Sequence, residues 1–335
     1  MSRPQNKEEF RREMAQSFSR ILEEKGLEWK KEWVGVANAP QNGITKANYR
    51  GCNAFWLSLV SMTKGYSDPR WVTMTQIMDK EGKYHPKEQW HLKKGSKATY
   101  VEYWYPFDQK EKKAMTWNDY KEALKAGRKP EEFRLSTRYT AVFNAGEIEG
   151  IPQLEQPVEN LDISEDELVR LLSDSMGVEI LNDGGNRAFY SPMQDKIHLP
   201  LASAFTTEYA YNATALHELS HATGHPTRLN RPQGAFFGTE QYAYEELVAE
   251  MSSCFMGVNL KTNLSPEHME NHKAYVQSWI QAITEKPDTL VKAIRDAQSA
   301  ANYMDYKAGL ISELEYEKTK GSVMELRPKE QEKER

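Results

Sequence analysis

The stretch TALHELSHATGH, residues 214–225, decides how the second half of this chain is interpreted. It contains His217, Glu218 and His221 in the order H-E-x-x-H, inside a segment whose composition predicts a helix. Because positions four apart lie on one face of a helix, the two imidazoles can bind one ion, and Glu218 points into the same cleft. The spacing therefore predicts a zinc site with Glu218 as its general base.

A catalytic zinc ion needs a third protein ligand and an open position for water. The best candidate is Glu246, on a helix predicted over residues 240–257. Glu250, one turn further along, is placed to accept a hydrogen bond from a ligating imidazole. Two alternatives remain open as third ligand. Glu245 lies about 100° round the helix from Glu246, and His225 lies where the first helix is expected to end.

The chemistry expected of this site is hydrolysis of a peptide bond, in which Glu218 takes a proton from water and returns it to the leaving amine. Residues 196–199 offer a backbone edge that an extended peptide can pair with. Tyr242 and Tyr244 are candidates for stabilising the oxyanion, although a core or surface position is the commoner role of such tyrosines. A purely structural zinc site is the competing interpretation, but such sites are commonly rich in cysteine, and this motif contains none.

The length of 335 residues predicts two domains, and the pattern of elements predicts an α+β protein. Residues 1–150 are expected to form a mixed α+β domain. Its expected elements are helices over 6–25 and 54–64 (the second capped by Asn53) and strands over 98–107 and 138–144, separated by a charged insertion at 109–132.

The second half is expected to be mainly helical, with a small β-sheet, over residues 163–325. A linker is predicted at 151–162, where two prolines and several acidic residues interrupt the periodicity. Residues 326–335 have almost no apolar side chain and are predicted to be disordered. The expected elements are helices near 164–177, 208–223, 240–257, 266–285 and 288–308 and paired strands at 187–192 and 195–200.

Charge is divided unevenly along the chain, whose overall net charge is −5. Residues 1–150 contain 27 Lys+Arg against 20 Asp+Glu, and the remainder contains 17 against 29. The first half is therefore basic and the second acidic, which indicates that only the first half is built to bind a polyanion.

The two cysteines and the lack of long apolar segments indicate where the protein works. Cys52 and Cys254 are far apart in the sequence and have no other expected ligand beside them, so both are expected to be free and buried. Neither a signal peptide nor a membrane span is evident, so a cytoplasmic protein without a membrane partner is expected.

Over nearly its whole length, the sequence resembles antirestriction proteins of the ArdC type. In the first half the resemblance rests on NYRGCNAFWL, KGYSDPRWVTMTQ, LKKGSKATYVEYW and YTAVFNAGEIEGIP. In the second half it rests on FYSPMQDKIHLP, TALHELSHATGHPTRLNR, YAYEELVAEMSSCFMG and YVQSWI. This chain departs from the family pattern in the insertion at 109–132 and in HPKEQWHLKKG, residues 85–95.

The resemblance implies an N-terminal domain that binds single-stranded DNA, also found fused to conjugative primases, and a C-terminal zincin-like metallopeptidase domain. In that family the pair helps plasmids or phages to survive restriction in a new host. Carried over to this chain, the resemblance implies zinc at His217, His221 and Glu246, with Glu218 catalytic.

Binding a single strand without sequence preference requires cations along the phosphate path and aromatic faces for the bases, and the first half interleaves both. The candidate DNA-binding residues are Lys46, Tyr49, Arg50, Arg70, Trp71, Lys93, Lys94, Lys97 and Arg138.

The leading hypothesis is an antirestriction protein that binds single-stranded DNA and carries one Zn²⁺ per chain. Other divalent metals are able to fill the same ligand set in vitro. A host restriction component, or another protein, is the expected peptide substrate. The alternatives are a DNA-protecting protein whose zincin domain is proteolytically inactive, and a zinc peptidase whose first domain is a protein-binding adaptor.

Overall fold

The computed structural model describes residues 3–26, 39–79, 81–85, 90–154, 165–233, 239–260 and 273–324. Most of the predicted linker, the first part of the helix predicted at 266–285 and the tail at 326–335 lie outside these ranges. None of the helices in the described ranges combines the length and the apolar character needed to cross a bilayer.

The first two helices form where apolar periodicity predicts them. Helix α1 (Lys7–Lys25) is capped by Asn6, whose side chain accepts a hydrogen bond from the backbone N–H of Glu9 at 2.8 Å. Helix α3 (Gly51–Lys64) begins earlier than predicted and ends at Gly65, whose φ of +68° suits a glycine C-cap. Asn53 is not the cap of α3.

Asn53 instead joins α3 to the sheet. Its side chain donates to the carbonyl of Glu102 at 2.7 Å and accepts from the N–H of the same residue at 2.9 Å. The prediction of a cap at this position was wrong because Asn53 lies inside the first turn of the helix, where its side chain is free to reach the neighbouring strand.

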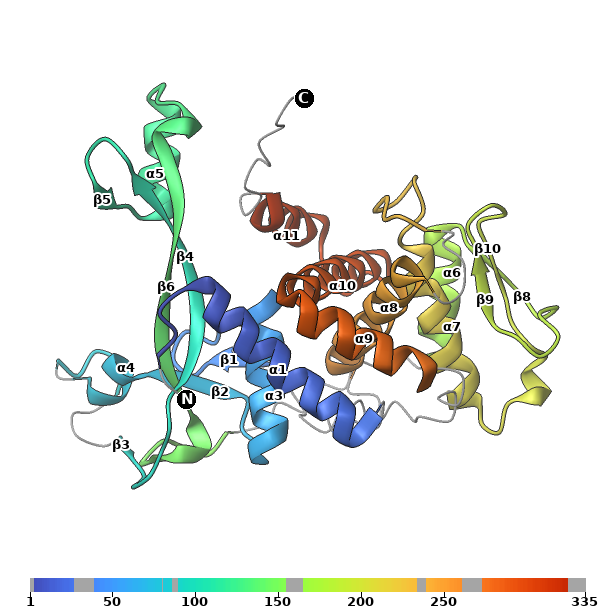
Figure 1. Cartoon of the computed structure of the whole chain (residues 1–335), viewed down its shortest axis with the longest axis horizontal. Coiled ribbons are helices and arrows are strands. Elements are labelled where there is room, and N and C mark those ends of the chain that lie inside the picture. Colours follow the sequence, from blue (N-terminus) through green and yellow to red (C-terminus); the bar gives the residue numbers. More distant parts are fainter. Residues whose placement is uncertain are drawn as a thin grey trace.

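A five-stranded sheet in the order β1-β2-β6-β4-β5 dominates the N-terminal region. Its longest pair is antiparallel, with Thr99 opposite Val142 and Asp108 opposite Phe133. Beyond its base this pair continues as a twisted two-stranded ribbon, with α5 at the far end, on one side of the molecule (Figure 1). The elements of this region after α1 and α3 are β1 (Gln41–Asn42), β2 (Arg70–Thr73), α4 (Met74–Met78), β3 (His91–Leu92), β4 (Thr99–Asp108), β5 (Lys113–Ala114), α5 (Trp117–Lys125), β6 (Phe133–Asn144) and β7 (Ile148–Glu149).

The C-terminal region is mainly helical and contains a small three-stranded sheet in the order β8-β10-β9. The predicted pair of strands is present and antiparallel, and β8, which was not predicted, adds in parallel to the other side of β10. A last helix, α11, was also not predicted. The elements are α6 (Glu165–Met176), β8 (Glu179–Leu181), β9 (Phe189–Ser191), β10 (Lys196–His198), α7 (Glu208–Ala222), α8 (Glu240–Leu260), α9 (Lys273–Glu285), α10 (Pro287–Lys307) and α11 (Glu313–Met324).

The two regions share one hydrophobic core. Helix α1 packs against α9 and α10, and α10 also contacts α3. Phe18 and Trp56 from the first region belong to the same buried cluster as Trp279 and Ile294 from the second. An ion pair between Arg11 Nη1 and Asp288 Oδ1, 2.7 Å long, crosses the same boundary. The N-terminal helix therefore packs as part of the helical region as well as against its own sheet.

Candidate metal centre

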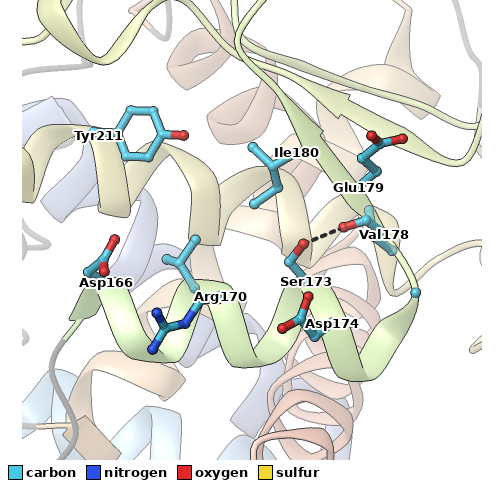
Figure 2. Close-up of a pocket in the computed structure, with 10 residues that line it drawn as sticks. Asp166, Arg170, Ser173, Asp174, Val178, Glu179, Ile180 and Tyr211 are labelled. Carbon is cyan, nitrogen blue, oxygen red and sulfur yellow. Dashed lines mark hydrogen bonds between the residues drawn. The ribbon is translucent and has the colours of Figure 1, made fainter.

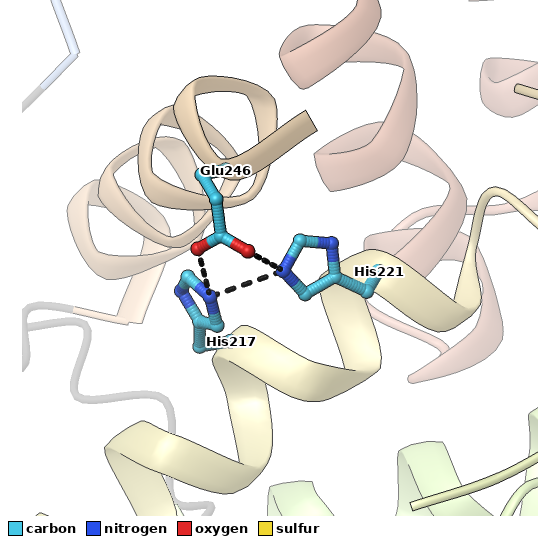
Figure 3. A group of neighbouring side chains, drawn as sticks. All are labelled: His217, His221 and Glu246. Carbon is cyan, nitrogen blue, oxygen red and sulfur yellow. Dashed lines mark hydrogen bonds and ion pairs between the residues drawn. The ribbon is translucent and has the colours of Figure 1, made fainter. Parts of the chain in front are cut away.

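The metal-binding histidines lie on α7, which is fixed on both sides. Thr207 caps this helix by accepting from the backbone N–H of Ala210 at 3.1 Å. The hairpin of β9 and β10 packs on one side of α7, and α8 packs on another. His217 and His221 are one turn apart, so both imidazoles reach toward α8 (Figure 3).

Figure 3 shows that the carboxylate of Glu246, on α8, meets both imidazoles. The two Nε2 atoms are 3.2 Å apart. Nε2 of His217 lies 3.5 Å from Oε2 of Glu246, and Nε2 of His221 lies 3.4 Å from Oε1. Among the described residues, these three side chains form the group whose donor atoms are placed to hold a metal ion.

These separations fit a zinc-like ion. Tetrahedral zinc bonds of about 2.0–2.1 Å place neighbouring ligand atoms about 3.3 Å apart, which is close to the spacing of the three donors. The donor set also fits in kind, because two imidazoles and one carboxylate leave a fourth position for water. The residues present therefore suit a divalent metal without rearrangement.

Each imidazole has a second carboxylate at its other nitrogen. Oε1 of Glu250 lies 3.6 Å from Nδ1 of His217, and Oε1 of Glu245 lies 3.6 Å from Nδ1 of His221. A carboxylate in this position favours the tautomer whose Nε2 is free to bind metal and orients the ring. Glu250 thus lies next to the imidazole that it is predicted to support, and its role stays a prediction. The sequence predicts Glu245 only as an alternative metal ligand. Its position next to Glu246 on α8 is the feature of the sequence that places it near His221.

Arg231 holds Glu245 in place. Its Nη2 lies 2.6 Å from Oε1 of Glu245, and its Nη1 donates to Oγ1 of Thr223 at 2.7 Å. The turn that carries Arg231 approaches the end of α7 so closely that a Cβ at Gly224 would collide with the amide of Gln233. Gln233 in turn donates to the carbonyl of His221. A larger residue at position 224 would therefore require the Gln233 side chain to move away from His221.

The charges around the donor set favour a cation. Burial lowers the pKa of both histidines, but for His217 the carboxylates of Glu250 and Glu246 outweigh it and the pKa is raised. For His221, Glu246 and Glu245 raise the pKa well above its usual value. Burial raises the pKa of Glu246, yet the two imidazoles hold it well below the usual range. The site therefore stabilises positive charge between its donors.

Glu218 lies beside the donor set and is buried, with 7% of its surface exposed. Burial raises the pKa of Glu218; the two histidines lower it and Glu246 raises it, and the balance is a raised pKa. The backbone of Tyr190, on β9, also lowers the pKa of Glu218, so this strand lies beside the carboxylate. A carboxyl group in this position is placed to exchange a proton with a molecule bound at the donor set.

The strand beside Glu218 is held by a separate set of polar contacts. The hydroxyl of Tyr190 donates to Oδ1 of Asp195 at 2.6 Å, and Arg228 pairs with the same carboxylate. Arg228 also donates to the carbonyl of Ala222, at the end of α7. The β9–β10 hairpin is thereby tied to the metal-binding helix.

The structure also places three other features predicted near the site: His225, Tyr244 and the strand edge at 196–199. His225 is outside the donor group and its Nδ1 hydrogen-bonds with Oγ1 of Thr227 at 2.8 Å. The hydroxyl of Tyr244 donates to Asp296 at 2.8 Å, so it is directed toward α10 rather than to an oxyanion. The edge predicted at 196–199 was wrong, because β10 is the central strand and pairs on both sides.

An open groove of about 560 Å³ lies elsewhere, between α6, β8 and Tyr211 of α7 (Figure 2). Its wall carries charged side chains from α6, including Asp166 and Arg170. None of the three metal-binding residues lines it, so the groove and the metal centre are separate features.

The candidate DNA-binding residues differ in how far they are exposed. Six side chains are exposed cations, and Tyr49 is half-buried against the core. Arg70 and Trp71 have only 5% and 1% of their surface exposed. Arg70 is bound to Asp68 and to the carbonyl of Pro152, and the Trp71 ring packs edge-on against Tyr66. We therefore do not keep these two in the candidate surface. The exposed members are Lys46, Arg50, Lys93, Lys94, Lys97 and Arg138.

Two known protein families match consecutive parts of this chain. Residues 167–296 match a zincin-like metallopeptidase family, so the metal centre and its helices define a zincin-like domain. Residues 8–143 match the N-terminal domain of anti-restriction factor ArdC. The chain belongs to the ArdC-type proteins, with an ArdC N-terminal domain followed by a zincin-like metallopeptidase domain.

Longer relatives contain the same two segments. Two Escherichia coli proteins named DNA primase TraC are each 34% identical to this chain, over 306 and 320 residues. These matches cover 89% and 90% of this chain, but the chain spans only 27% and 21% of the length of the primases. The uncharacterized protein y4eC of Sinorhizobium fredii is 29% identical over 265 residues, which cover 79% of this chain and 80% of y4eC.

Two crystal structures of the antirestriction protein ArdC from plasmid R388 share the fold. One is metal-free and the other contains Mn(II). Each has a TM-score of 0.67 and 25% sequence identity, over 90% of this chain and 98% or 99% of the solved chain. The His217, His221 and Glu246 metal site therefore belongs to a fold in which a solved relative holds a divalent metal.

Proposed function

We propose that this chain is an antirestriction protein that binds single-stranded DNA through its N-terminal region and hydrolyses a peptide bond at a zinc centre. Its role would be to protect incoming plasmid or phage DNA from host restriction. The observation that carries this proposal is the combination, in one chain, of an ArdC N-terminal domain with a complete two-histidine, one-glutamate donor set.

The residues of the metal centre suit hydrolysis. A metal held by His217, His221 and Glu246 would act as a Lewis acid, which lowers the pKa of a bound water molecule to about 7 and polarises a carbonyl group. Glu218 accepts the proton of the attacking water and delivers it to the departing amine. Its buried position beside the donor set supports this double role.

Strand β9 offers the place for an extended peptide. In the order β8-β10-β9 this strand pairs with β10 on one side, and no other described strand pairs with its second side. Strand β9 is next to the metal-binding helix, because α7 contacts β9 and the backbone of Tyr190 lies beside Glu218. A peptide added to this edge would be held by main-chain hydrogen bonds with its carbonyl near Glu218.

Glu218→Gln is the variant that tests the hydrolytic part. It keeps the size of the side chain and removes the base, so we expect one equivalent of metal to remain bound while cleavage in a peptide library falls by about 10²–10⁴-fold. Metal content by elemental analysis and cleavage by mass spectrometry are the two measurements. Unchanged cleavage by this variant would remove Glu218 from the mechanism.

The same variant tests the link between hydrolysis and protection. Cells expressing either the wild type or Glu218→Gln receive single-stranded plasmid DNA in the presence of a restriction system, and surviving transformants are counted. We expect the variant to lose protection. Full protection by a variant that cleaves nothing would instead support a DNA-protecting protein whose zincin-like domain does not act as a peptidase.

A further inference from the structure

The register of the β4–β6 ribbon sorts its side chains onto two faces. Alternate residues of paired strands point to opposite sides, and in this pair Tyr103 is opposite Arg138 while Glu102 is opposite Tyr139. We call the side with Tyr103, Tyr105, Phe107, Arg134 and Arg138 the arginine face. We call the side with Glu102, Trp104, Asp108, Phe133 and Tyr139 the packed face.

The packed face is covered at both ends by helices. Near the base of the ribbon, the ring of Tyr139 lies 5.2 Å from the ring of Phe10, on α1. Near the far end, the ring of Phe133 lies 5.1 Å from the ring of Tyr120, on α5. These contacts give the packed face a structural role at both of its ends.

The acidic groups of the ribbon also lie on the packed face, and both are satisfied there. Glu102 accepts hydrogen bonds from the hydroxyl of Tyr139 at 3.0 Å and from Nε1 of Trp104 at 2.7 Å. Asp108 is bound by Arg128, whose Nη2 donates at 3.1 Å. None of the ribbon positions on the arginine face is acidic, so its cations have no carboxylate partner within the ribbon itself.

The arginine face carries cations stacked on aromatic rings. The guanidinium carbon of Arg138 lies 4.5 Å from the ring centre of Tyr103 and 6.0 Å from that of Tyr105. The guanidinium carbon of Arg134 lies 4.6 Å from the ring centre of Phe107. Both arginines are exposed, and Tyr103 has 42% of its surface exposed. Flat groups of both kinds are therefore presented to solvent on one side of the ribbon.

We propose that the arginine face is a platform on which the bases of single-stranded DNA stack while the two arginines contact its phosphates. This inference rests on the proposed function and names the surface that would perform its DNA-binding part. Aromatic rings and guanidinium planes stack on any base, which is the chemistry that non-specific single-strand binding requires. A strand whose bases are already paired has no free base face to offer.

The dimensions of the face fit a short run of nucleotides. Arg134 and Arg138 are four residues apart on one strand, a distance of about 13 Å at the usual rise per residue. Stacked nucleotides advance by about 3.4 Å each, so the two cations span about four nucleotides. Three rings lie along the same length, which matches one contact for nearly every base.

Tyr103→Ala and Arg138→Ala are the variants that test the platform, with a labelled single-stranded oligonucleotide and fluorescence anisotropy across a salt series. We expect each to weaken binding by about tenfold, because Tyr103→Ala removes a stacking contact and Arg138→Ala removes a phosphate contact. Tyr103→Phe keeps the ring and should bind within twofold of the wild type. Arg138→Ala should also reduce the magnitude of the salt slope by about 0.7, whereas Arg138→Lys should leave the slope unchanged.

Arg187→Ala is the matched control. The guanidinium carbon of Arg187 lies 5.8 Å from the ring centre of Phe189, so the zincin-like region also has an exposed arginine–aromatic pair. Its removal should leave DNA affinity unchanged. Metal content is measured for every variant, and one equivalent per chain shows that the fold is retained.

The possible failures are distinguishable. If the wild type binds no single strand, the proposed function itself is wrong and the platform falls with it. If the wild type binds but Tyr103→Ala and Arg138→Ala bind equally well, the arginine face is not the platform and the DNA-binding surface lies elsewhere. Equal affinity of the wild type for duplex and single strand, with equal losses in the variants, would also overturn a role in base stacking.

Discussion

The metal centre and the β4–β6 ribbon differ in what holds their important side chains in place. At the metal centre, the imidazoles of His217 and His221 are only 14% and 12% exposed, and a carboxylate lies at the second nitrogen of each. On the ribbon, Tyr103 and Arg138 are exposed and are aligned mainly by strand register. The first geometry is fixed by packing between helices, and the second by the pairing of two strands.

This difference suits two different kinds of ligand. A metal ion requires donor atoms placed to within a few tenths of an ångström, which packed helices provide. A flexible strand of nucleotides adapts to a row of rings and cations, so an exposed ribbon is sufficient. Mutations at the metal centre and on the ribbon should therefore differ in their effects on metal binding and on the free energy of unfolding.

The largest effect is expected from removing a metal ligand. His217→Ala deletes one of three donors from a site whose other two are held 3.4 Å apart, so we expect stoichiometric zinc binding to be lost. Isothermal titration calorimetry with Zn²⁺ measures this directly. His225→Ala is the control, since His225 follows the same helix but lies outside the donor group. Loss of zinc binding in the control would mean that the ligand set is different.

A smaller effect is expected from the same Phe→Ala change made in the two regions. Phe18 is fully buried in the shared core, so Phe18→Ala should lower the free energy of unfolding by about 3–5 kcal/mol. Phe107 is half-buried on the arginine face, so Phe107→Ala should cost about 1 kcal/mol or less.

Urea unfolding followed by circular dichroism measures both changes. Because α1 packs against α9 and α10, Phe18→Ala should also lower the temperature at which zinc is released. Two separate transitions, with zinc release unaffected by Phe18→Ala, would show that the regions unfold independently despite their common core.

The smallest effect is expected from Glu250→Gln. Oε1 of Glu250 lies 3.6 Å from Nδ1 of His217, where it orients the ring without being a ligand. Replacing it should weaken zinc affinity by about 10–100-fold while the stoichiometry stays at one. Glu240→Gln, at the exposed start of the same helix, is the matched control and should change nothing. Equal zinc affinity in Glu250→Gln would assign Glu250 a purely structural role.

Much of the architecture could be predicted because it depends on short-range patterns. Apolar residues at helical spacing placed α1, α7 and α10 to within a few residues, and aromatic and β-branched runs placed β4. β8 and α11 escaped prediction because one is three residues long and the other has little apolar periodicity.

The predicted candidate site divides in the same way. The spacing of His217 and His221 could be interpreted from the sequence because four residues make about one helical turn. The sequence alone left Glu245 and Glu246 as alternatives, since adjacent residues differ only in how a helix is rotated against its neighbour. Contact between α7 and α8 placed Glu246 at the donor set and Glu245 at the far side of His221.

By itself, then, the sequence determined the spacing of the metal-binding histidines, the basic character of the first half and the two-region order of the chain. Only the tertiary structure decided that Arg70 and Trp71 are buried, that β10 is the central strand, and that α1 shares a core with α9 and α10. The physical reason is that periodicity and charge are properties of neighbouring residues. Burial and strand order depend on contacts between segments that are distant in the chain.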